Sequence, residues 1–415
     1  MSFDLSDQPK VLAKPQQSYV VPITLIVSLY FGIGFITAMN DILVPHFKDL
    51  FHLSNVAALL VQFCFFGAYF VMSLPSGWII GRIGYKSGII AALATMGLGL
   101  LLFQPAARII YYPLFLLGLF IVGSGLALLQ VAVNPYIGAL GSPQTAASRL
   151  NLAGGLNSLA GTIAPHVGAI FIFIAAGATT AQLAHSVQTP YLVLAICAFT
   201  MAVATAFVPL PEVIARRSAD DRSPVSAWSF RHLKLGALGI FFYVGAEVTI
   251  GSLLINFLGQ PTMGGLSHSV AAGYVSLYWG GAMFGRFIGF FVLQRVRANR
   301  ALAAVSSVAL LLITLTLLAH GHVAIWAVVS CGLCNSIMWP CIFPLALEGL
   351  GKATSQGSGI LVTMVVGGAL IPLVQGTLAD RFGYQHSFAV VLLCYAYILF
   401  YALRGYRTTS PALAA

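Results

Sequence analysis

The chain has 415 residues, of which 59 % are hydrophobic and only 7 % are charged, and its mean hydropathy is +0.93. Soluble domains carry about 25 % charged residues, and so few polar side chains could not cover a water-exposed surface. The composition therefore indicates an integral membrane protein and excludes disordered, coiled-coil, collagen and disulfide-stapled classes. The net charge of +10 is spread over short segments between apolar runs, so it indicates orientation in a bilayer and no nucleic-acid partner.

A membrane-spanning helix needs about 20 mostly apolar residues. Twelve such runs lie near residues 20–43, 55–80, 87–104, 112–138, 150–176, 189–208, 235–258, 270–293, 301–319, 323–349, 357–379 and 384–403. The sequence therefore predicts an all-α membrane protein with twelve transmembrane helices. The charge-rich segment 209–234 separates two sets of six, so we expect an N-terminal six-helix bundle over 1–208, a cytoplasmic linker over 209–234 and a C-terminal bundle over 235–415.

The basic residues support this count. With the polar tail 1–18 inside, sixteen basic residues fall on the inner side and three fall on the outer side, namely Lys48, Arg108 and Arg381. Arg286 falls within the eighth span, near its inner end. This positive-inside bias predicts a multi-pass protein of the cytoplasmic (inner) membrane with both termini in the cytoplasm.

Two carboxylates fall within the apolar runs. Asp41 lies near the outer end of the first span, and Glu247 lies midway along the seventh. A carboxylate inside the bilayer costs several kcal/mol, so it indicates function by default. Either residue could bind and release a proton or ligate Na⁺, while Asp41 could also lie simply at the headgroup level. We therefore predict that Asp41 and Glu247 couple transport to H⁺ or Na⁺.

Proline interrupts the fourth and the tenth span at matching positions, at Pro135 and Pro340. A proline frees a carbonyl group and allows a kink. Matched, interrupted helices in two six-helix halves are typical of rocker-type secondary transporters, although proline and glycine are also common in membrane helices without such a role. We assign Pro135 and Pro340 to gating.

Uncharged polar and aromatic side chains accompany the two carboxylates. Buried amides often serve only as hydrogen bonds between helices. Together with aromatic rings, however, they suit a neutral polyhydroxylated solute, which needs amide hydrogen bonds and flat apolar faces. The predicted substrate-binding residues are Gln62, Gln130, Asn134, Asn151, Asn157, His166, Asn256, Tyr278, Trp279, Asn335 and Trp339.

Other functional classes find no support in the sequence. It has no P-loop for an ATP-driven pump and no H-E-x-x-H or G-x-S-x-G pattern for an intramembrane enzyme. Cys331-x-x-Cys334 lacks the second pair that a zinc site needs. We expect no enzyme activity, no metal site and no cofactor besides the coupling ion.

Several segments carry a family resemblance: 40–43 (NDIL), 130–136 (QVAVNPY), 149–152 (RLNL), 157–158 (NS) and 243–247 (YVGAE). On these motifs the chain resembles the major facilitator superfamily, and within it the fucose and glucose/galactose permeases. The resemblance implies two pseudo-symmetric six-helix bundles and uptake of a monosaccharide by alternating access. Asn157 matches a position near the sugar.

The resemblance also bears on the coupling ion. In fucose permeases the aspartate matching Asp41 acts together with a fourth-helix glutamate, but here that position is Gln130, which cannot titrate. Gln130 together with Glu247 looks more like the glucose/galactose branch, for which Na⁺ as well as H⁺ has been proposed. Residues 77–86 (GWIIGRIGYK) resemble the superfamily's loop motif, with Gly81 in place of its aspartate, and 285–295 resembles the counterpart in the second half. The resemblance thus implies gating roles for Arg82 and Arg286.

These observations predict a monomeric secondary transporter that imports a neutral, glucose- or galactose-like hexose with H⁺ or Na⁺. Its partners are the sugar and the lipid bilayer. An uncoupled sugar facilitator and an H⁺-driven exporter of drugs or sugars, both of the same fold, remain as alternatives.

Overall fold

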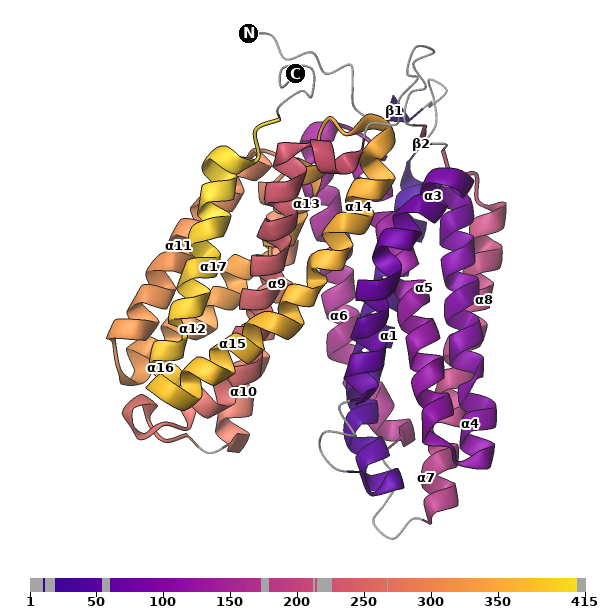
Figure 1. The fold of residues 1–415 in the computed structure, drawn as a ribbon, viewed down its shortest axis with the longest axis horizontal. Coiled ribbons are helices and arrows are strands. Elements are labelled where there is room, and N and C mark those ends of the chain that lie inside the picture. Colours follow the sequence, from indigo (N-terminus) through magenta and orange to yellow (C-terminus); the bar gives the residue numbers. More distant parts are fainter. Residues whose placement is uncertain are drawn as a thin grey trace.

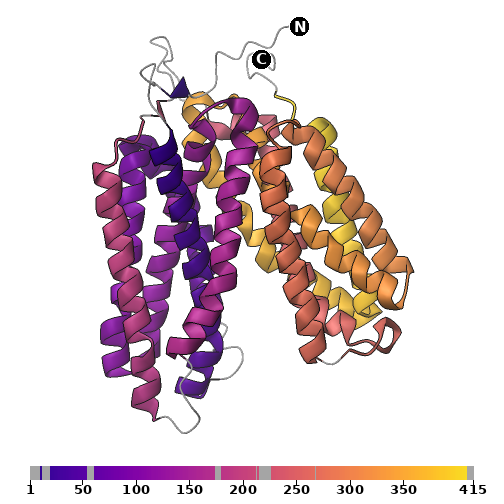
Figure 2. The same cartoon turned by 180° about the vertical axis from the view of Figure 1, so that it is seen from behind.

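The computed structural model describes residues 10–11, 19–53, 60–172, 179–211, 213–214, 226–266 and 268–408, and these residues are almost entirely helical. The predicted all-α fold with twelve membrane-spanning helices is confirmed. Two bundles of helices stand side by side in a V (Figure 1 and, from behind, Figure 2). They contact each other at the end where the chain termini lie and separate at the opposite end.

The first bundle contains α1 (Val20–Phe51), α3 (Leu60–Leu101), α4 (Phe103–Ile109), α5 (Tyr112–Ala139), η2 (Pro143–Thr145), α6 (Ala146–Ile172), α7 (Thr180–Ser186) and α8 (Gln188–Phe207). In this bundle α1 packs on α6, and α3 packs on α5 and α8. The following segment is outside the described residues at 212 and 215–225. Its Val213–Ile214 (β2) pairs antiparallel with Lys10–Val11 (β1).

The second bundle contains η3 (Ala227–Ser229), α9 (Arg231–Leu258), η4 (Pro261–Met263), α10 (His268–Val292), α11 (Ala298–Leu318), α12 (Gly321–Asn335), α13 (Met338–Leu347), η5 (Gly351–Ala353), α14 (Thr354–Thr363), η6 (Met364–Val366), α15 (Gly367–Phe382), α16 (Tyr384–Ser387), α17 (Ala389–Phe400) and the π-helical η7 (Tyr401–Gly405). Here α9 packs on α13, α15 and α17, and α10 packs on α12.

Ten helical stretches of the described chain are long and apolar enough to cross a membrane. One of them, Phe63–Ile109, has 47 residues and contains the second and third spans. Its helices meet at Gly84, whose φ of 79° and ψ of 169° interrupt the helix. The ten stretches therefore contain eleven spans. Helix α6 supplies the fifth span and brings the number to twelve.

The tenth and eleventh spans are broken in the middle. The tenth consists of α12 and α13, which are interrupted at Ser336 and Ile337. Pro340 explains this break, because it has no N–H to donate to the carbonyl of Ser336. The eleventh changes from α14 through the 3₁₀ turn η6 into α15. Pro135, by contrast, lies within the continuous helix α5.

Small residues allow the two bundles to approach at the closed end. There α14 contacts α3 and α5, and α6 contacts α10 and α13. A Cβ on Gly77 would lie 2.7 Å from the Ser355 carbonyl oxygen, and one on Gly359 would lie 2.6 Å from that of Ser73. Only glycine fits at these positions, so the contact between α3 and α14 depends on them.

Candidate functional site

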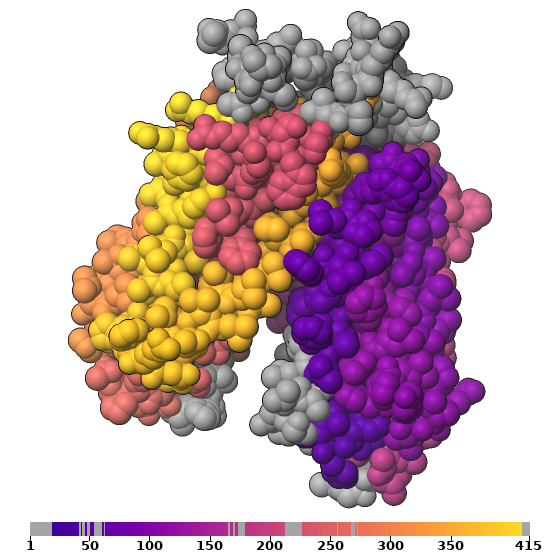
Figure 3. All heavy atoms as spheres, in the orientation of Figure 1, coloured from indigo at the N-terminus to yellow at the C-terminus, as the bar shows by residue number. Residues whose placement is uncertain are grey.

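A cavity of about 720 Å³ lies between the two bundles. The space-filling view shows the hollow between the bundles on the side away from the termini (Figure 3). Helices α1, α3, α5 and α6 line the cavity from the first bundle, and α9, α10, α13 and η6 line it from the second. Its volume is within the range of small-molecule sites, about 300–1,000 Å³.

Amide side chains and tyrosines form the wall of the first bundle. The Tyr30 hydroxyl donates a hydrogen bond to Oδ1 of Asn134. Asn157 Nδ2 donates to the Tyr30 carbonyl oxygen at 3.0 Å, and Gln130 Nε2 donates to the Tyr69 hydroxyl at 3.0 Å. These bonds fix which amide atoms remain for a solute: Nδ2 of Asn134 has no partner, and Oδ1 of Asn157 is not engaged by Tyr30.

The local sequence explains why α1 and α6 come so close. Tyr30 and Thr37 are two turns apart on α1, with Gly34 between them on the same face, and all three line the cavity. A Cβ on Gly34 would lie 2.1 Å from the Asn157 carbonyl oxygen. The glycine thus lets α6 bring Asn157 against Tyr30.

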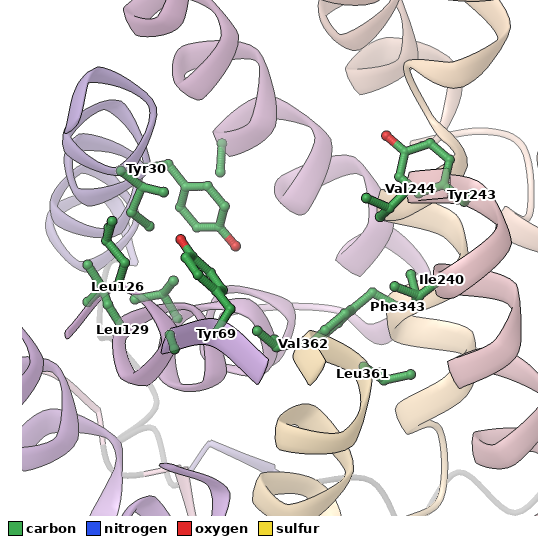
Figure 4. Close-up of a cluster of buried hydrophobic side chains, with 14 of the residues drawn as sticks. Tyr30, Tyr69, Leu126, Leu129, Ile240, Tyr243, Val244, Phe343, Leu361 and Val362 are labelled. Carbon is green, nitrogen blue, oxygen red and sulfur yellow. The ribbon is translucent and has the colours of Figure 1, made fainter. Parts of the chain in front are cut away.

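Aromatic rings form much of the opposite wall. Trp279 on α10 and Trp339 on α13 both line the cavity, and Trp279 is 43 % exposed. The rings of Trp339 and Tyr243 are 6.5 Å apart. Figure 4 shows Tyr30 and Tyr69 on one side of the space between the bundles and Tyr243 facing them from the other. Such rings offer flat apolar faces on which a sugar ring can stack.

An ion pair lies in the same wall. Arg286 Nη2 on α10 is 3.7 Å from Glu247 Oε1 on α9, and both residues line the cavity. The two opposite charges balance each other within the site. Glu247 Oε1 and Arg286 Nε are buried and have no hydrogen-bond partner, so each has unused hydrogen-bonding capacity in this structure.

Two predicted substrate contacts lie behind this wall. Tyr278 is fully buried, and its hydroxyl donates to the Glu247 carbonyl oxygen at 2.9 Å. Asn335 Nδ2 donates to the Tyr278 hydroxyl at 2.8 Å, and Asn335 Oδ1 accepts from Tyr395 at 2.7 Å. Neither Tyr278 nor Asn335 lines the cavity. They hold α9, α10, α12 and α17 together, as interhelical amides often do.

The other described predictions lie elsewhere in the structure. Asn151 donates to the Arg286 carbonyl oxygen across the closed end, so it joins the bundles and does not line the cavity. Asn256 is exposed on α9. The exposed Arg82 lies 3.6 Å over the Trp78 ring, as in a cation–π contact. Of the predicted gating residues, Arg286 and Pro340 line the cavity, and Arg82 and Pro135 do not.

Three predicted side chains lie outside the described part of the chain: those of Asp41, Gln62 and His166. Their helices are described, but nothing further follows for the side chains. Among the residues that the structure describes, no group of three or more His, Cys, Asp or Glu could hold a metal ion.

The sequence prediction missed part of the cavity wall, namely Tyr30, Thr37, Tyr69 and Ser158. Tyrosine and threonine are common in the cores of membrane bundles, so nothing in their identity indicates a site. The helical spacing of Tyr30, Gly34 and Thr37 is the one signal that could have indicated a shared face.

Comparison with known proteins agrees with this geometry. The profile of the Major Facilitator Superfamily matches residues 26–371. The chain is 49 % identical over 395 residues to the glucose/galactose transporter of Brucella abortus biovar 1 (strain 9-941), covering 95 % of this chain and 96 % of the relative. It is 32 % identical over 421 residues to the L-fucose-proton symporter of Escherichia coli (strain K12), covering 94 % of both. The crystal structure of FucP in the outward conformation superimposes with a TM-score of 0.86 at 32 % identity, over 95 % of this chain and 100 % of FucP.

Proposed function

The chain belongs to the Major Facilitator Superfamily and carries sugar together with a cation, and we propose that the sugar is a neutral hexose of the glucose and galactose type. It is a multi-pass membrane protein and not an enzyme. We place it in the inner membrane as a monomer, with both termini in the cytoplasm, as the sixteen inner basic residues favour.

The composition of the cavity carries the proposal for a neutral solute. Its first wall offers the uncharged amides Gln130, Asn134 and Asn157, and its second offers Trp279 and Trp339. Among the residues that the structure describes, the charged side chains that line it are Glu247 and Arg286, which form a pair. A charged solute would need an unbalanced opposite charge, whereas a sugar hydroxyl can donate to the amide oxygens and to Glu247 and can accept from the amide nitrogens, the indole N–H groups and Arg286.

The shape of the molecule supports import by alternating access. The bundles are closed at the end of the termini and open at the other end, so with cytoplasmic termini the cavity faces outward. The solute enters there, and rocking of the bundles then opens the inner side. Pro340 at the break of the tenth span, Pro135, Arg82 and Arg286 are the proposed gating residues.

Cation coupling is assigned to the two membrane carboxylates. Glu247 faces the solute cavity, and Asp41 lies on α1 of the other bundle. Binding of H⁺ or Na⁺ neutralises a carboxylate and so changes the net charge that has to be enclosed in a dry, occluded cavity.

Uptake of radiolabelled D-glucose into proteoliposomes tests the function, with a Na⁺ gradient and a pH gradient imposed separately. Unlabelled galactose, fucose, mannose and N-acetylglucosamine serve as competitors. We expect accumulation driven by one of the two gradients, with galactose as an effective competitor.

Each other outcome contradicts a defined part of the proposal. Equilibration without accumulation would make the protein a facilitator, as the uncharged Gln130 would allow. Accumulation after replacement of both Asp41 and Glu247 by amides would show that the coupling assignment is wrong. Absence of hexose transport would contradict the sugar specificity.

A further inference from the structure

Arg286 contacts both bundles at once. Its Nη1 donates to the Gly154 carbonyl oxygen at 3.0 Å and to the Ser158 hydroxyl at 2.7 Å, both on α6 of the first bundle. Its Nη2 lies 3.7 Å from Glu247 on α9 of its own bundle. A guanidinium cannot lose its proton in a protein. Arg286 therefore links the proposed coupling carboxylate to the contact that must break when the inner side opens.

In the part of the chain that the structure describes, Arg286 is the charged side chain that faces Glu247. The titratable groups that face Glu247 in the described part of the chain are Tyr243 on its own helix and Tyr278 and Arg286 on α10. On the α12 side, the hydrogen-bond network behind Tyr278 continues to the uncharged Asn335. When Glu247 takes up a cation, Arg286 thus loses the partner that balances its charge.

Building on the proposed coupling role of Glu247, we propose that Arg286 prevents the carrier that holds a cation but no sugar from changing state. Between its two open forms the cavity is closed on both sides, and water can no longer solvate the guanidinium. An unbalanced buried charge is costly, and the neutral acceptors on α6 are withdrawn as the inner side opens. The cation-loaded, sugar-free carrier therefore cannot change from one open form to the other.

The empty and the fully loaded carriers escape this block for different reasons. In the empty carrier, the ionised Glu247 pairs with Arg286 as the contacts to Gly154 and Ser158 break. In the fully loaded carrier, hydroxyl oxygens of the sugar accept hydrogen bonds from the guanidinium, whose Nε has no partner in the present structure. Only these two forms cross, which is the condition for symport without leakage of the cation.

A second-site suppressor experiment tests this role of Arg286. Glu247→Gln mimics the permanently neutralised carboxylate, so Arg286 has a partner only when sugar is bound. Two rates are measured in proteoliposomes: counterflow, with sugar on both sides, and net downhill flux, which requires the sugar-free carrier to return. We expect Glu247→Gln to lower the ratio of net flux to counterflow by about tenfold or more.

The double variant Glu247→Gln, Arg286→Gln removes the unbalanced charge and is expected to restore the ratio, giving downhill flux without accumulation. Glu247→Gln, Arg286→Lys is the matched control: it keeps the charge, so its ratio stays low. A double variant with Gln at 286 whose ratio also stays low would overturn the inference, and so would a Lys variant that restores the ratio equally well.

Failure of the proposed function gives a different result. If Glu247→Gln still accumulates sugar against its gradient, Glu247 is not the coupling carboxylate. If the Glu247 variants show no counterflow, Arg286→Gln alone decides: exchange of the labelled driving cation across liposomes without sugar, with the cation on both sides so that only the cation-loaded carrier has to cross, should rise by about tenfold. An unchanged rate of exchange would contradict the role of Arg286.

Discussion

The proposed contact between Asn157 and the solute can be tested with a single substitution. Its Nδ2 is engaged by the Tyr30 carbonyl, so its Oδ1 is the acceptor left for a sugar hydroxyl. Asn157→Ala removes this acceptor, and loss of one hydrogen bond of about 1.4 kcal/mol weakens affinity about tenfold. Titration calorimetry with the purified protein measures the change.

Asn256→Ala provides the matched control for Asn157→Ala. Asn256 is an amide in the other bundle, exposed on α9 and away from the cavity. Its replacement should leave the affinity for sugar unchanged. An equal loss in both variants would indicate a general effect on the fold and contradict the placement of Asn157 at the solute.

Tyr278 is expected to act on stability and not on affinity. Tyr278→Phe leaves the Glu247 carbonyl without its donor and Asn335 Nδ2 without its acceptor. Unpaired buried groups of this kind cost about 1–3 kcal/mol each, so the melting temperature in detergent should fall. Tyr274→Phe, one turn away on α10 and packed against Trp326, is the control. A variant with unchanged melting temperature but weakened sugar binding would mean that Tyr278 contacts the solute.

Single residues differ in how far their roles could be predicted from sequence. A carboxylate in an apolar run is so costly that Glu247 indicates function wherever it lies. Its ion pair with Arg286 could not be predicted, because it depends on which face α10 turns toward α9. For the same reason the sequence predicts Asn151, Tyr278 and Asn335 as solute contacts, although packing turns them toward other helices.

At the scale of elements, the lengths of the helices follow from the thickness of the bilayer. Apolar runs of about 20 residues predicted all the spans for this reason. The interruption of the tenth span follows from Pro340, but the 3₁₀ turn η6 in the eleventh has no proline within it. Here α15 packs so closely on α9 that a Cβ on Gly367 would lie 2.0 Å from the Phe241 carbonyl oxygen. Such tertiary packing cannot be deduced from the local sequence.

Two interhelical turns share a conformation that favours glycine. Gly84, between the second and third spans, has φ 79° and ψ 169°, and Gly383, between the last two, has φ 83° and ψ 158°. Both follow an Arg-x-Gly-Tyr pattern, at 82–85 and 381–384. A side chain in this region costs about 1–3 kcal/mol, so Gly84→Ala and Gly383→Ala should each lower the melting temperature in detergent.

Gly67→Ala is the matched control for these turns. Gly67 lies inside α3, and a Cβ there would meet no atom within 4 Å. Because alanine favours a helix by about 1 kcal/mol over glycine, this variant should melt at the same temperature or higher. Equal melting temperatures for Gly84→Ala and Gly67→Ala would show that the turn does not require glycine.

For the whole molecule, the distribution of charge and apolar runs predicted two six-helix halves, but the state in which they are seen depends on contacts between distant segments. On one side of the closed end, Ser148 donates to the Phe290 carbonyl at 2.6 Å, and on the other Ser358 donates to the Val131 carbonyl at 2.9 Å. These bonds join residues more than 140 and 220 positions apart. No local pattern could indicate them.

A disulfide across the closed end should hold the carrier in the present state, which is open to the outside in the proposed orientation. A Cβ on Gly81 of α3 would lie 3.2 Å from Oγ of Ser355 on α14, which is compatible with the Cβ separation of about 3.5–4.5 Å that a disulfide needs. We expect the double variant Gly81→Cys, Ser355→Cys to form this bond on oxidation. The oxidised protein should then lose transport, because the closed end can no longer open. Reduction should restore transport, and sugar binding measured by calorimetry should persist in the oxidised protein because the cavity is already open at the end away from the termini. The two single variants, treated with the same oxidant, show whether oxidation of the six native cysteines alone affects transport. An oxidised, cross-linked double variant that still transports sugar would show that α3 and α14 do not have to separate during the transport cycle.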